Sequence, residues 1–79
     1  MKNRMRICRA ELDWTQAQLA AKIGVSRQAI VAVENGKYDP ALPLAFRISR
    51  ALGKNVEEVF IWEEPAANGF TTVGFSFGT

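Results

Sequence analysis

Three consecutive polar residues, Ser26, Arg27 and Gln28, are the part of this chain best suited to chemistry. Arginine can make paired hydrogen bonds to guanine, and glutamine to adenine, at base edges in the DNA major groove. Ile30 and Val33 follow at the spacing of an inward-facing helical stripe. If that stripe is buried, the polar side chains gather on the outside of a helix at its N-terminal end. This arrangement suits a helix that reads bases in duplex DNA.

Two short helices joined by a tight turn must position these side chains. Thr15 and Gln18 have the spacing of a capping box, so we expect the first helix to begin there. Gly24 ends it, because the residue just past a helix end often needs a positive φ that glycine adopts without steric penalty. Ser26 can cap the second helix, and Asn35–Gly36 ends it. A short helix braced by the one before it is a helix-turn-helix.

A family resemblance rests on residues spread along the expected helices. They are Thr15-Gln16, Leu19-Ala20, Gly24-Val25-Ser26-Arg27-Gln28, Ile30 and Glu34-Asn35-Gly36-Lys37, with Tyr38-Asp39-Pro40 and Pro43-Leu44 further on. The segment resembles the Xre/Cro, phage-repressor-like family of helix-turn-helix regulators, and a compact bacterial and archaeal subgroup of it, over roughly residues 3 to 62. The resemblance implies a lambda-repressor-like fold and double-stranded DNA as the partner.

Three more helices are expected around this pair. The first runs from residue 2 or 3 to residue 13 and has Met5, Cys8 and Leu12 on its apolar side. The others run from residue 43 to 52 and from residue 56 onward, behind the cap at Asn55. The fold class expected is therefore all-α, a five-helix domain over residues 1–63. Residues 64–79 are expected to be a separate tail, with a short β extension that could be a hairpin or a dimer strand.

The expected DNA contacts fall into two groups. The side chains at the leading end of the second helix would reach base edges, and Ala32, with or without Val31, would touch a thymine methyl. The resemblance implies phosphate contacts at both ends of the helix pair, where helix N-termini also favour anions. The expected base contacts are Arg27, Gln28, Val31 and Ala32, and the expected phosphate contacts are Gln16, Ser26, Asn35 and Lys37.

The resemblance also implies an ion pair between Arg9 and Glu34. Such a pair would tie the first helix to the end of the DNA-reading helix, and loss of either partner would leave a partly buried charge unpaired. The alternative is two unrelated surface charges.

Composition sets limits on the function. The 79 residues are 48% hydrophobic, carry a net charge of +2 and include one cysteine and no histidine. Residues 1–38 hold seven Lys/Arg against three Asp/Glu, whereas residues 39–79 hold three against five, so the expected DNA-reading half is the basic one. No apolar run is long enough for a membrane span and no secretory signal begins the chain, which favours the cytoplasm. We expect no metal, no cofactor and no enzymatic activity, because no metal-ligand cluster or nucleophile–base arrangement is present.

The C-terminal end offers apolar surface beyond the expected helices. Phe60-Ile61-Trp62 is a dense apolar cluster, and Val73, Phe75 and Phe77 alternate along a stretch typical of a strand. Ala67-Asn68-Gly69 is a turn pattern, so residues 60–63 and 70–77 could pair as a hairpin. The tail could form sheet across a homodimer, bind another protein or a small ligand, or be a flexible end. We favour the first, which makes both apolar clusters dimer contacts.

The function that these features favour is sequence-specific transcriptional regulation, most simply repression, by a homodimer on a palindromic operator. One short helix reads too few base pairs to select a site in a genome, and a two-fold dimer doubles the contact. The alternative is an antitoxin-like or anti-regulator module whose main partner is another protein, bound through the uncharged part of the tail, residues 65–79, with DNA binding secondary.

Overall fold

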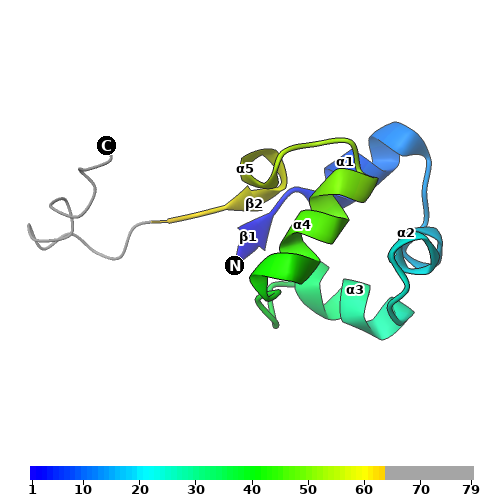
Figure 1. Ribbon diagram of the computed structural model, residues 1–79, viewed down its shortest axis with the longest axis horizontal. Helices are drawn as coiled ribbons and strands as arrows, with labels where there is room; N and C mark the ends of the chain where they lie inside the picture. The colour runs from blue at the N-terminus through cyan, green and yellow to red at the C-terminus, as the bar shows by residue number, and fades with distance from the viewer. Residues whose placement is uncertain (64–79) are drawn as a thin grey trace, which may run out of the picture.

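Five helices and one two-stranded sheet make up the part of the chain that the computed structural model describes, residues 1–63. In chain order they are β1 (Lys2–Asn3), α1 (Met5–Leu12), α2 (Gln16–Ile23), α3 (Arg27–Glu34), α4 (Leu42–Ala51), α5 (Val56–Val59) and β2 (Phe60–Ile61). The helix α2 packs against α3 and α4, and α4 packs against α5, which leads into the sheet (Figure 1). The expected all-α, five-helix class is confirmed.

Local hydrogen bonds set the boundaries of α2 and α3. The Thr15 hydroxyl accepts from the N–H of Gln18 at 3.0 Å, and the Gln18 side chain accepts from the N–H of Thr15 at 2.8 Å. Gly24 ends α2 with a φ of +76°, in the left-handed region that favours glycine. The Ser26 hydroxyl then accepts from the N–H of Ala29 at 3.1 Å and caps α3. The caps predicted for these two helices are those that the structure uses.

The start of the chain differs from the expectation, because α1 begins at Met5 and not at residue 2 or 3. Lys2 and Asn3 instead form β1, which runs antiparallel to β2 and pairs Lys2 with Ile61 and Asn3 with Phe60. The Asn3 side-chain oxygen accepts from the N–H of Met5 at 3.0 Å. Asparagine side chains that bond the backbone nearby compete with helix, so Asn3 holds the chain extended up to the first turn of α1.

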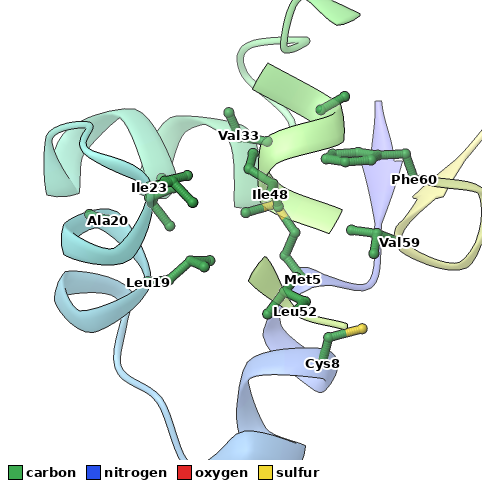
Figure 2. Close-up of a cluster of buried hydrophobic side chains, with 12 residues drawn as sticks. Met5, Cys8, Leu19, Ala20, Ile23, Val33, Ile48, Leu52, Val59 and Phe60 are labelled. Carbon is green, nitrogen blue, oxygen red and sulfur yellow. The ribbon is translucent and has the colours of Figure 1, made fainter. Parts of the chain in front are cut away.

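The core lies where the helices meet, and Figure 2 shows its side chains converging from all five helices. Cys8 belongs to it, and burial, with the Glu11 carboxylate nearby, raises the pKa of its thiol. Leu12 does not belong to the core, because it is the last residue of α1 and is 40% exposed. The prediction that Leu12 lies on the buried side of the first helix is therefore wrong. The most deeply buried apolar side chains are Met5, Leu19, Ile30, Val33, Ile48 and Val59.

The strand β2 has a partner that the sequence did not indicate, because the structure pairs Phe60 and Ile61 with β1. The sheet thus joins the two ends of the helical domain. The hairpin that residues 60–63 could form with residues 70–77 stays a prediction. Residues 64–79 lie outside the described residues, and with them the predicted contacts Val73, Phe75 and Phe77.

The apolar cluster at residues 60–62 divides between the interior and the surface. Phe60 is 7% exposed and packs in the core, so most of its side chain stabilises the monomer, and its expected role as a dimer contact stays a prediction. Ile61 is half-buried, and Trp62 is 69% exposed. Within residues 1–63, no helix combines the length and the apolar character that a membrane span requires.

Candidate nucleic-acid interface

The outer side of α3 carries the four residues that the sequence assigns to base contacts. Arg27 and Gln28, in the first turn, are exposed, and Val31 and Ala32, one turn further on, are half-buried. On the opposite side of the helix, Ile30 and Val33 are 0% and 1% exposed. Because that side is buried in the core, the side that carries the four residues faces outward. The apolar stripe fixes the rotation of α3 about its axis, and that rotation presents the arginine and the glutamine to solvent.

A bidentate ion pair holds the C-terminal end of α3 against α1. The Arg9 Nε donates to Glu34 Oε2 at 2.6 Å, and its Nη2 donates to Glu34 Oε1 at 3.0 Å. Arg9 also donates through Nη1 to the backbone carbonyl of Trp14 at 2.8 Å. The two paired side chains are only 12% and 1% exposed, so the pair is shielded from water. The ion pair that the resemblance implied is present, and two unrelated surface charges are excluded.

Gln16, the first residue of α2, connects this ion pair with the expected base contacts. Its side-chain nitrogen donates to Glu34 Oε1 at 3.1 Å. Its side-chain oxygen accepts from Arg27 Nη2 at 3.3 Å. The sequence assigned Gln16 to a phosphate but did not indicate this link, because residues 16, 27 and 34 become neighbours only when α2 and α3 pack. Hydrogen bonds therefore run without a break from Arg9 to Arg27.

The segment after α3 carries Asn35 and Lys37, which are both exposed. Backbone bonds fix it: the N–H of Gly36 donates to the Val33 carbonyl and the N–H of Lys37 to the Ala32 carbonyl, each at 3.1 Å. Gly36 has a φ of +76°, which closes a glycine-type helix end. The two polar side chains thus leave a well-defined turn directly beside the end of α3.

Asn3 reinforces that turn from the sheet. Its side-chain nitrogen donates to the Val33 carbonyl at 3.0 Å, at a position where the last carbonyls of a helix need partners. Sequence reasoning missed this contact, and the only available signal was an asparagine ahead of α1. Ser26 and Gln16, the other expected phosphate contacts, lie at the N-terminal ends of α3 and α2.

Arg47 has a different role from the one that the sequence favoured. The sequence predicts that Arg47 lies on the outer side of α4 as a solvated residue, with a phosphate contact as the alternative. The structure has its Nη2 donating to the Ile23 carbonyl at the C-terminal end of α2, beside the turn at Gly24. A cation at this end of a helix is favoured by the helix dipole.

These features define a helix-turn-helix domain with a polar, solvent-facing second helix. Within residues 1–63, no group of three His, Cys, Asp or Glu side chains is placed to hold a metal ion. Comparison with known proteins assigns this domain to a family.

Residues 5–59 match the family described as Helix-turn-helix. An uncharacterized HTH-type transcriptional regulator of Methanocaldococcus jannaschii is 52% identical over 64 residues, which cover 81% of this chain and 97% of the relative. The immunity repressor protein of Bacillus phage phi105 is 37% identical over 68 residues, 80% of this chain and 47% of the relative. The chain belongs to the Xre/Cro-like helix-turn-helix family and is a DNA-binding transcriptional regulator.

A solved structure has the same fold. It is that of a hypothetical transcription factor, NHTF, from Neisseria, with a TM-score of 0.65 and 31% sequence identity. The match covers 68% of this chain and 61% of that chain, so this chain spans less than two thirds of that protein.

Proposed function

We propose that the protein is a repressor that binds a palindromic operator as a homodimer. In this proposal α3 lies in the major groove, where Arg27 bonds a guanine and Gln28 an adenine. Ala32 and Val31 contact a thymine methyl one turn further along the helix. Repression then follows from occupation of the DNA, because nothing in residues 1–63 suggests a separate activating unit.

One observation carries the proposal: Arg27 is exposed to solvent and yet held in place. Its guanidinium has Gln16 as a hydrogen-bond partner, and Gln16 in turn is fixed by the Arg9–Glu34 ion pair. A side chain that is already oriented loses less conformational entropy when it bonds a base edge. A solvated surface arginine with no recognition role would need no such support.

Four residues around α3 are proposed to hold the DNA backbone. Gln16 and Ser26 lie at the N-terminal ends of α2 and α3, where free backbone N–H groups and the helix dipole favour phosphate. Asn35 and Lys37 lie on the turn at the other end of α3. Phosphate contacts at both ends fix the angle at which the helix enters the groove.

Dimerisation is proposed on the side of the molecule that carries β2. Trp62 and Leu42 are 69% and 64% exposed and line a common groove of about 310 Å³ with Phe60 and Val56. Large exposed apolar side chains grouped in this way mark protein interfaces. A second copy that covers them, with Ile61 at the edge of the contact, would place two α3 helices in successive major grooves.

Selection of bound sequences from a random pool of duplex DNA tests the proposal with the full chain. We expect the wild-type protein to enrich a palindromic consensus and the double variant R27A/Q28A to lose it. Arg6→Gln, on the exposed side of α1, is the matched control and retains the consensus. A consensus without two-fold symmetry would exclude the dimer. No enrichment, together with a stable complex with another protein on copurification, would favour the antitoxin-like alternative.

A further inference from the structure

A cavity of about 370 Å³ lies between α4 and the segment that leads into α5. Its volume falls at the lower end of the range for small-molecule sites, roughly 300–1,000 Å³. Three basic side chains line it, Arg47, Arg50 and Lys54, and none of the described lining residues is acidic. Figure 1 shows the C-terminal end of α4 beside α5, whereas the N-terminal end of α4 follows the turn after α3.

Two of the three cations are held in place by other parts of the fold. Arg47 donates to the Ile23 carbonyl, and the Lys54 ammonium lies 3.3 Å from the Glu11 carboxylate. Arg50 is exposed, and its guanidinium forms no hydrogen bond or ion pair with any residue in 1–63. A guanidinium has five N–H donors, so the one bond that Arg47 makes leaves others for a ligand. The cavity therefore combines anchored positive charge with one guanidinium that has no partner.

Ser49 supplies a second, independent observation. It is 2% exposed, lines the same cavity, and its hydroxyl is the one buried side-chain polar atom within residues 1–63 that has no hydrogen-bond partner. Buried polar groups are nearly always satisfied, and an unpaired one calls for an explanation. A hydroxyl can donate to an anionic oxygen, and the neighbouring guanidinium of Arg50 can bind the same group.

The rest of the cavity wall is apolar. Phe46 is 56% exposed, and Val56 is half-buried against the core. A bare inorganic anion would leave this surface in water, whereas an anion attached to an apolar body would cover it. We propose that the cavity binds a small organic anion. Its carboxylate or phosphate group lies between Ser49 and Arg50, and its apolar or aromatic body lies on Phe46 and Val56.

Titration of the full ¹⁵N-labelled chain, followed by NMR chemical shifts without DNA, tests this site independently of the proposed operator. Phenyl phosphate is the main probe, benzoate and inorganic phosphate are the comparisons, and benzyl alcohol is the neutral one. We expect saturable shifts in residues 46–56 with phenyl phosphate, at an apparent Kd of about 1 mM or lower. If benzoate binds more tightly than phenyl phosphate, the anionic group of the natural ligand is a carboxylate. Benzyl alcohol should give no saturable shift, because it lacks the charge.

Two variants test the residues that carry the inference. We expect Arg50→Gln to weaken phenyl phosphate binding about tenfold, because it removes a charged hydrogen bond. Ser49→Ala should weaken it about threefold and leave the melting temperature unchanged or raised, since the hydroxyl has no partner in the fold. Arg6→Gln removes an exposed cation elsewhere and should have no effect. Equal affinity in Arg50→Gln, shifts that gather at Arg27 and Lys37 instead, or no saturable shift would overturn the proposal.

Discussion

Replacing Glu34 with glutamine removes one charge from a shielded site and keeps the shape of the side chain. The carboxylate accepts bonds at 2.6 and 3.0 Å from Arg9 and one at 3.1 Å from Gln16. A glutamine can retain one of these acceptors, but the Arg9 guanidinium is then left 12% exposed and without a counter-charge. Loss of one partner of a buried pair costs about 3–5 kcal/mol, and the retained acceptor brings our expectation to about 2–4 kcal/mol.

That loss is large against the stability of so small a domain. At roughly 0.05–0.15 kcal/mol per residue, a domain of the 63 described residues has a free energy of unfolding of about 3–9 kcal/mol. Urea titration followed by circular dichroism measures the change directly. Glu63→Gln is the matched control, because Glu63 pairs with Lys2 at 3.1 Å on the surface, where both side chains are more than 60% exposed. We expect that control to lose less than about 1 kcal/mol.

The double variant R9M/E34L separates the cost of a stranded charge from the value of the pair. Because two apolar side chains leave no buried charge, it should be more stable than either single variant. If Glu34→Gln loses no more stability than Glu63→Gln, the ion pair does not hold α3 in place. The argument for a pre-oriented Arg27 would then fail.

Four further substitutions test the interface, the turn and the dimer. Arg27→Ala should weaken operator binding by about 1–3 kcal/mol and relax selectivity at one base pair; equal weakening on every sequence in competition gel shifts would make it a phosphate contact. Lys37→Ala should weaken binding to all sequences and lower the salt slope by about one, so an unchanged slope would remove Lys37 from the interface. Gly24→Ala places a side chain at a φ of +76°, with only Arg47 Nη2 at 3.6 Å from the new Cβ, so we expect a loss of about 1–2 kcal/mol in urea titration from backbone strain alone. Trp62→Ser should shift the protein to monomer in sedimentation velocity with unchanged helix content, and an unchanged dimer would move the interface elsewhere.

The features that sequence reasoning predicted are those with local causes. The Thr15–Gln18 capping box, the left-handed Gly24 and the Ser26 cap each depend on residues within one helical turn. They can therefore be recognised in the sequence without knowledge of the fold. The same holds for Ile30 and Val33, whose spacing determined which side of α3 is buried.

The features that it missed are those in which distant segments meet. The sequence prediction includes Asn3 in the first helix, because nothing local indicates that strand pairing with residues 60–61 delays the start of α1 to Met5. Arg47 likewise looks like a solvated residue until α4 crosses the end of α2 and the Ile23 carbonyl becomes available. The resemblance to a family supplied the one distant pair that was predicted, Arg9 with Glu34. Periodicity along one helix could not have supplied it.

The charge of Glu34 also determines how Arg27 is supported. The two ends of the Gln16 amide differ, since nitrogen only donates and oxygen only accepts. The Glu34 carboxylate only accepts, so it turns the Gln16 nitrogen toward itself and leaves the Gln16 oxygen facing Arg27. A glutamine at position 34 can donate as well as accept, and it removes this constraint on the amide. Under conditions where Glu34→Gln is still folded, it should therefore relax selectivity at the base pair that Arg27 reads, although residue 34 makes no DNA contact in the proposed complex.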